Sequence, residues 1–188
     1  MHQTILVLDF GSQYTQLIAR RLRELSVHSE LLPFNSSLEE IRQRQPVGII
    51  LSGGPKSILD AGAPKCDPGI FQLGIPILGI CYGHQILAKK FGGKVKISKT
   101  KEFGKAFVKS KLKSPITKNF FKHKRNQVWM SHQDIVYKIP PGFKKIASSD
   151  NSKFAIICQC SYNFRSTFVQ LPNIMRHPTP PPHVPPPP

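Results

Sequence analysis

The first half of the chain alternates short apolar runs with stretches of helical spacing. Three apolar runs of strand length predict buried strands: Thr4–Leu8, Val27–Leu32 and Gly48–Leu51. Apolar residues recur at helical spacing over Leu17–Leu25, and Ser37–Glu40 matches a capping box for a second helix that runs to about Gln45. This alternation predicts an α/β fold with an open, mostly parallel sheet and helices on both faces.

The pattern becomes looser in the second half. Pro64–Leu73 suggests a loop with a short helix. After Gly93, we expect separate strand-like pieces joined by turns: Lys94–Ile97, Ala106–Val108, Gln127–Met130 and Phe154–Ile157. A loop, Ser131–Asp134, is expected after the third of these pieces.

The most informative motif is Gly79–Gln85, with Cys81 at its centre. It follows the apolar run Ile75–Leu78 and precedes residues at helical spacing, which predicts a strand, a sharp turn and a helix. Glycines two residues either side of Cys81 leave room where the strand and helix approach each other. At a helix N-terminus the thiolate form of the cysteine is favoured, so Cys81 is a candidate nucleophile. The alternative is a buried cysteine that packs as a small apolar residue.

A second glycine-rich segment, Ser52–Pro55, follows the third predicted strand. Loops at the carboxyl ends of parallel strands line the ligand crevice of an open α/β sheet, so we expect this loop to face Cys81. The alternative for the tetrapeptide alone is an ordinary Gly-Pro turn.

Length and charge restrict the possibilities further. At 188 residues the chain suits one α/β domain. The net charge is +17, and from Lys89 to Arg125 there are fourteen Lys or Arg residues against one acid, Glu102. Such a density is compatible with nucleic-acid binding. Because the basic residues are scattered over strand-like and turn-like pieces, with no aromatic stacking motif between them, we favour a solvated face or one that docks an acidic partner domain.

The remaining composition points to an intracellular protein. The chain has no apolar stretch of membrane-spanning length and no signal-peptide pattern, so we expect a cytoplasmic protein without membrane contact. Its cysteines, at positions 66, 81, 158 and 160, lack zinc-site spacing and should be reduced thiols. No metal site is predicted.

Together these motifs resemble those of the class I glutamine amidotransferases. The resemblance covers about Ile5–Phe164 and combines four stretches: Leu8–Gln16, Leu51–Pro55, Leu78–Gln85 and Val128–Asp134. Leu78–Gln85 is most similar to the amidotransferase domains of GMP synthetases. The resemblance implies a flavodoxin-like fold over residues 1–164.

The resemblance also implies roles for particular residues. Cys81 would attack the side-chain amide of glutamine and form a thioester, while the backbone N–H groups of Gly54 and Tyr82 form the oxyanion hole. The residues expected to contact glutamine are Gly53, Gln85, Ser131 and His132. The ammonia would pass to an ATP-pyrophosphatase (synthetase) domain or subunit for conversion of XMP to GMP. No cofactor is expected in this chain, since ATP and Mg would bind the synthetase portion.

The family's late Phe-His-Pro-Glu-Val motif, which supplies the histidine and carboxylate of the catalytic triad, is not intact. One alignment deletes the histidine and sets Asn173 against the glutamate. The other retains His177, which lies too late and has no carboxylate partner. Residues 165–188 form a divergent, Pro-rich tail that is expected to be extended or disordered. The tail is either foreign to a complete amidotransferase or part of a degenerate one.

Three other functions therefore stay open. The chain could be an amidotransferase for a different acceptor, a catalytically inactive module that binds a synthetase partner, or a nucleic-acid binder that uses the Lys-rich stretch.

Overall fold

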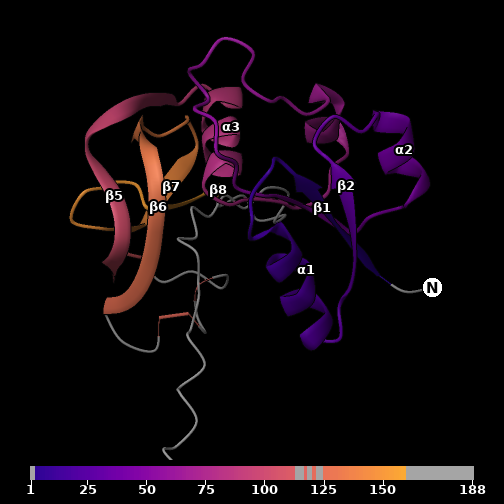
Figure 1. The fold of residues 1–188 in the computed structure, drawn as a ribbon, viewed down its shortest axis with the longest axis horizontal. Coiled ribbons are helices and arrows are strands. Elements are labelled where there is room, and N and C mark those ends of the chain that lie inside the picture. Colours follow the sequence, from indigo (N-terminus) through magenta and orange to yellow (C-terminus); the bar gives the residue numbers. More distant parts are fainter. Residues whose placement is uncertain (1–2, 113–116, 118–119, 122–124, 160–188) are drawn as a thin grey trace, which may run out of the picture.

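The computed structural model describes residues 3–112, 117, 120–121 and 125–159, which form two four-stranded sheets. Figure 1 shows the antiparallel sheet on the left and the parallel half of the molecule on the right, with helix α3 between them. The predicted Pro-rich tail, Asn173 and His177 lie outside the described residues.

The parallel sheet confirms the strands predicted in the first half of the chain. Its members are β1 (Thr4–Asp9), β2 (His28–Pro33), β3 (Gly48–Leu51) and β4 (Ile77–Gly79). They pair in the order β2-β1-β3-β4, and every pair is parallel. The carboxyl ends of all four strands therefore lie at the same edge of the sheet, where the loops that follow β3 and β4 meet.

Helices cover both faces of this sheet, as predicted. They are α1 (Thr15–Glu24), α2 (Leu38–Gln43) and α3 (Tyr82–Lys90). Side chains of a strand alternate between the two faces. On one face Leu6, Leu8 and Leu51 belong to a core cluster with Ile41 of α2 and Leu87 of α3. On the other face Val7 and Ile50 pack with Ile18 and Leu22 of α1.

Local signals fix the ends of the shorter elements. The Ser37 side chain accepts a hydrogen bond from the backbone N–H of Glu40 at 3.1 Å, which confirms the N-cap of α2. The helix ends at Gln43, slightly before the predicted end, and Gln45 adopts a positive φ of 46° that is incompatible with a further helical turn. The predicted short helix is a 3₁₀ helix, η1 (Pro68–Gln72).

The second half forms an antiparallel sheet of β5 (Lys94–Ser110), β6 (Arg125–Lys138), β7 (Phe143–Ser148) and β8 (Ile156–Gln159), in the order β6-β5-β7-β8. The prediction of separate pieces was wrong for β5 and β6. Because β5 and β6 pair with each other, both strands continue through polar stretches where turns were expected. The pairing register shifts between Ile97 and Glu102. The expected loop at Ser131–Asp134 is consequently part of β6.

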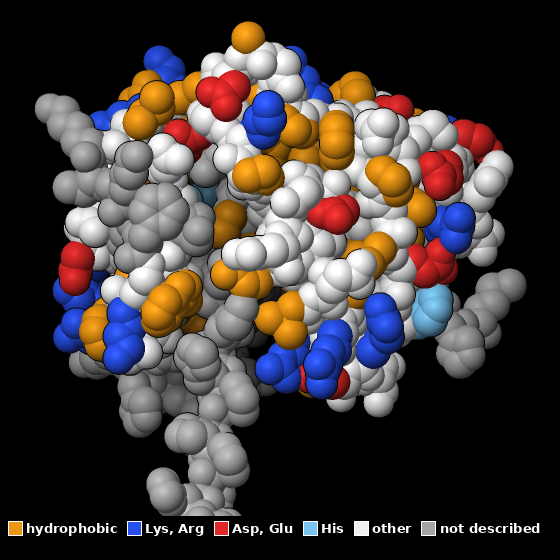
Figure 2. Space-filling view, viewed as in Figure 1, with side chains coloured by type: hydrophobic (Ala, Val, Ile, Leu, Met, Phe, Trp, Pro, Cys, Tyr) orange, Lys and Arg blue, Asp and Glu red, His pale blue; other side chains and the backbone are white. Residues whose placement is uncertain are grey.

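The basic residues of β5 lie beside aromatic residues of β6, which the sequence pattern did not reveal. Lys105 pairs in register with Trp129, which is 40% exposed, and the Lys96 ammonium lies 5.3 Å from the ring centroid of Tyr137. Figure 2 shows Lys and Arg side chains in several separate groups on the face in view. Within the described residues, no helix is long and apolar enough to cross a membrane.

Truncation of Leu51 should destabilise the fold strongly. Leu51 is fully buried where β3 packs against α3, so Leu51→Ala leaves a cavity and should lower the free energy of unfolding by about 2–5 kcal/mol. Leu25→Ala is the matched control, because Leu25 is 74% exposed and should change stability by about 0.5 kcal/mol or less. Urea denaturation followed by circular dichroism measures both values, and equal effects would contradict this account of the core.

Candidate functional site

Cys81 lies at a sharp turn between β4 and α3, as the motif predicts. It is the N-cap residue of α3 and adopts φ 49° and ψ −104°, a positive φ that is unusual for a residue other than glycine. A Cβ atom on Gly79 would lie 2.6 Å from the carbonyl carbon of Gly83, and a Cβ atom on Gly83 would clash with the carbonyl oxygen of Leu51. The two glycines therefore allow the strand, turn and helix to pack closely.

The Ser52–Pro55 loop contacts this turn, which confirms that the two segments face each other. The backbone N–H of Gly83 donates to the carbonyl oxygen of Ser52 at 3.1 Å. The Ser52 hydroxyl in turn accepts from the backbone N–H of Phe10 at 2.9 Å, which ties the loop to the end of β1. A Cβ atom on Gly53 would lie 3.5 Å from the Cβ of Cys81. The loop backbone is thus held next to the cysteine.

A cavity of about 350 Å³ opens beside Cys81. Its wall includes five of the seven residues named from the sequence: Gly54, Cys81, Tyr82, Gln85 and His132. Gly53 lies next to Cys81, and the side chain of Ser131 is outside the described part of the structure. Tyr82 is the first residue of α3, so its N–H has no intrahelical acceptor and is suited to the proposed oxyanion hole. The volume suits a small polar metabolite.

The cavity wall also includes residues that the sequence motifs do not single out individually. They are Pro55, Lys56, Ser57, Asp60, Ile97, Gln133 and Asp134. Lys56, Ser57 and Asp60 follow the glycine-rich loop closely. Gln133 and Asp134 belong to a stretch that carries the family resemblance. Their closeness to these motifs in the sequence was the signal that could have identified them. Ile97 lies beside Asp134 because β5 pairs with β6, and this contact could not be derived from spacing.

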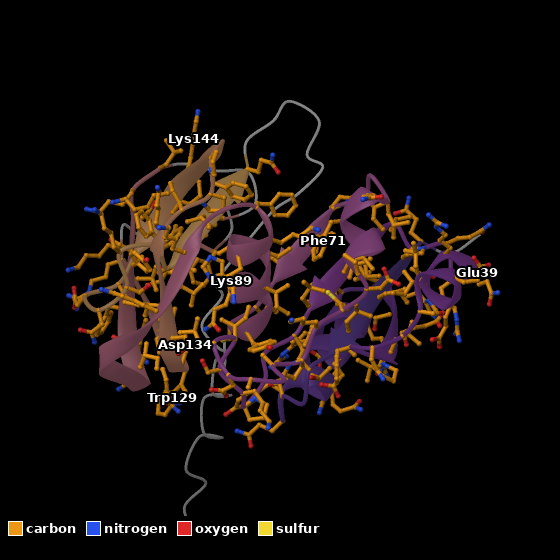
Figure 3. All side chains as sticks on the ribbon, turned by 90° about the horizontal axis from the view of Figure 1, so that it is seen from above. Glu39, Phe71, Lys89, Trp129, Asp134 and Lys144 are labelled. Atoms are coloured by element: carbon orange, nitrogen blue, oxygen red, sulfur yellow. The ribbon has the colours of Figure 1, made fainter. Side chains whose placement is uncertain are left out.

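Buried hydrogen-bond acceptors gather at one part of the cavity wall. The Gln85 side-chain amide donates to the backbone carbonyl of Asp134 at 3.2 Å. This leaves Gln85 Oε1 and Asp134 Oδ1 buried without a partner among the described residues. In Figure 3, Asp134 lies at the side of the antiparallel sheet that faces α3. Buried acceptors of this kind are usually satisfied, so a ligand that carries hydrogen-bond donors fits this region.

Burial opposes the expected ionisation of Cys81. The residue is 8% exposed, and loss of solvent raises the pKa of its thiol to about 12. Its position at a helix N-terminus predicts that the thiolate is favoured. In this structure the burial acts in the opposite direction, so the thiol needs a proton acceptor before it attacks a substrate.

Two buried histidines lie near each other in the same region. His84, from the motif around Cys81, is fully buried, and both of its ring nitrogens lack hydrogen-bond partners among the described residues. Burial, with a smaller contribution from His132, lowers the pKa of His84 to about 3. The His84 imidazole is therefore neutral at physiological pH and a weak base. His132 lies on β6 with 6% exposure, in the wall of the cavity.

Comparison with known proteins identifies relatives of this chain. Residues 6–167 match the family model for glutamine amidotransferase class-I. The glutamine-hydrolysing GMP synthase of Campylobacter lari is 55% identical over 152 residues, which are 81% of this chain and 29% of that protein. The corresponding protein of Chlorobium chlorochromatii is 53% identical over 172 residues, 90% of this chain and 32% of its own length. The chain thus spans about 30% of the length of these relatives.

Solved structures show the same fold. A candidate component of GMP synthase from Thermoplasma acidophilum superposes with a TM-score of 0.76 at 29% identity, covering 91% of this chain and 84% of that one. A glutamine amidotransferase from Thermotoga maritima superposes with a TM-score of 0.67 at 23% identity, covering 91% of this chain and 76% of that one.

The pH dependence of Cys81 alkylation should reveal the effect of burial. Because a raised pKa keeps the thiol protonated at neutral pH, the rate of reaction with iodoacetamide should rise by about tenfold per pH unit from pH 7 to pH 9. Mass spectrometry of peptides measures this rate, with Cys81→Ser confirming the assignment. A rate that is already constant at pH 7 would show that the helix N-terminus dominates.

Proposed function

This chain belongs to the class-I glutamine amidotransferase family, and on that premise we propose that its cavity binds L-glutamine and that Cys81 attacks the glutamine side-chain amide. The observation that carries the proposal is the position of Cys81, at a strained turn in the wall of a cavity that also contains buried acceptors. Glutamine has an amide at one end and an ammonium and a carboxylate at the other. The amide end would lie at Cys81, and the other end would lie at the buried acceptors.

The acceptors fit the amino-acid end of glutamine. Asp134 and Asp60 contribute carboxylates to the cavity wall, and Gln85 Oε1 is a neutral acceptor. An α-ammonium group would satisfy the buried oxygens that have no partner, and the attraction between opposite charges is strengthened by burial. Lys56, in the same wall, is the positively charged residue that suits the α-carboxylate.

The reaction has two balanced steps. The Cys81 sulfur bonds to the amide carbon, the carbon–nitrogen bond breaks, and the thiol proton leaves with the nitrogen as ammonia. Water then attacks the thioester, which releases glutamate and restores the thiol. Backbone N–H groups of Gly54 and Tyr82 would stabilise the oxyanion in both steps, and removal of one such donor typically costs about 3–4 kcal/mol.

The relatives suggest the use of the ammonia. They are glutamine-hydrolysing GMP synthases, so we propose that this chain supplies ammonia for the conversion of XMP to GMP in purine biosynthesis. The partner would be a synthetase domain or subunit that binds ATP and Mg. The reaction would take place in the cytoplasm. We also propose that residues 1–164 form the amidotransferase domain and that residues 165–188 form a separate tail.

A second candidate is a glutamine-binding module without turnover. The raised pKa of Cys81 and the departure from the triad motif favour this alternative. Proton transfer by a general base contributes about 10² to 10⁴ in rate, so a chain without its base should be slower by that factor. Ammonia release above the rate of Cys81→Ala indicates an enzyme, whereas glutamine binding with no such release indicates a binding module.

Glutamine should protect Cys81 from alkylation, and Asp134→Asn should weaken that protection. Loss of the carboxylate charge removes a charge-assisted interaction with the α-ammonium, so the glutamine concentration for half-protection should increase about tenfold or more. The measurement is the iodoacetamide rate at Cys81 against glutamine concentration. Asp150→Asn is the control, since Asp150 is exposed and paired with Lys109. No protection at any concentration would contradict the proposed substrate.

A further inference from the structure

Ser57 connects the segment after β3 to the antiparallel sheet. Its hydroxyl lies 2.5 Å from Asp134 Oδ2, although the two residues are 77 positions apart. Both line the cavity, and Ser57 is half-buried while Asp134 is only 3% exposed. This hydrogen bond therefore links two segments that form the wall of the proposed glutamine site.

The surrounding hydrogen bonds determine the direction in which the hydroxyl points. The backbone N–H of Leu59 donates to Ser57 Oγ at 3.1 Å, and the backbone N–H of Ser57 donates to Asp60 Oδ2 at 3.0 Å. Since a carboxylate oxygen accepts hydrogen bonds, the Ser57 hydroxyl is the donor to Asp134 Oδ2. The serine is thus held by its own segment and has one donor, which is directed at the carboxylate.

Asp134 is held from two sides as a result. Ser57 fixes Oδ2, and Gln85 donates to the backbone carbonyl of Asp134 at 3.2 Å. The other carboxylate oxygen, Oδ1, is buried and has no partner among the described residues. Because rotation of the carboxylate would break the Ser57 hydrogen bond, Oδ1 stays available to a donor in the cavity.

We propose that Ser57 is a positioning residue that sets selectivity for amides with an α-ammonium group, by holding Asp134 in the orientation that accepts this ammonium. The inference rests on the proposed function and extends it to a residue that does not itself contact the reacting amide. Without Ser57, the carboxylate rotates among several orientations, and the ammonium gains less from it than in the intact site.

The test compares two ligands that differ in one group. L-glutamine and glutaramate have the same amide and the same carboxylate, but glutaramate lacks the α-amino group. Isothermal titration calorimetry of the full chain, carrying Cys81→Ala to prevent turnover, gives the ratio of the two dissociation constants. We expect glutamine to bind more tightly, and Ser57→Ala to reduce the ratio by about tenfold while the affinity for glutaramate changes little.

Two further variants separate positioning from general stability. Ser57→Thr retains a hydroxyl and should restore most of the ratio. Ser37→Ala removes the N-cap of α2, which should lower the melting temperature without changing the ratio, because Ser37 is not part of the cavity wall.

Other outcomes would overturn one idea or both. Equal weakening of both ligands by Ser57→Ala would show that the serine only maintains the loop, which overturns the inference. Equal binding of both ligands by the parent chain would also overturn it, while leaving an amide-binding site intact. Binding of neither ligand would overturn the proposed function and the inference together.

Discussion

The close approach of the Cys81 turn to the end of β3 is the constraint on which the site depends. The backbone N–H of Ile80 donates to the Leu51 carbonyl at 2.9 Å, and the N–H of Gly83 donates to the Ser52 carbonyl at 3.1 Å. Only a glycine at position 83 permits this distance, because any Cβ atom there meets the Leu51 carbonyl. At this contact Cys81 adopts a positive φ, and the glycine-rich loop lies beside it.

The antiparallel sheet supplies the other part of the cavity wall. Cys81, Gly54 and Tyr82 come from the edge of the parallel sheet, whereas His132 and Asp134 come from β6 of the antiparallel sheet. The hydrogen bond from Gln85 on α3 to Asp134 joins the two halves, since α3 contacts both sheets. The cavity therefore lies where the halves meet, which is a common location for ligand sites.

The environment of Cys81 has opposing effects on its reactivity. The N-terminus of α3 favours a thiolate, but burial raises the thiol pKa to about 12. A buried thiol is protected from side reactions, yet it reacts only when a base accepts its proton. His84, the histidine of the same motif, is held neutral with a pKa of about 3 and is therefore a weak base.

The sequence alone determined the features that depend on nearby residues. The parallel strands, the capped helix α2 and the turn at Cys81 follow from apolar runs, Ser37 and flanking glycines, because these signals act within a few positions of the structure that they specify. The meeting of the glycine-rich loop with Cys81 followed as well, since parallel strands end at one edge. Tertiary structure alone decided that β5 and β6 are long paired strands, that Ser57 reaches Asp134 and that Cys81 is deeply buried. Each of these depends on contacts between segments far apart in the chain, where spacing carries no information about distance in space.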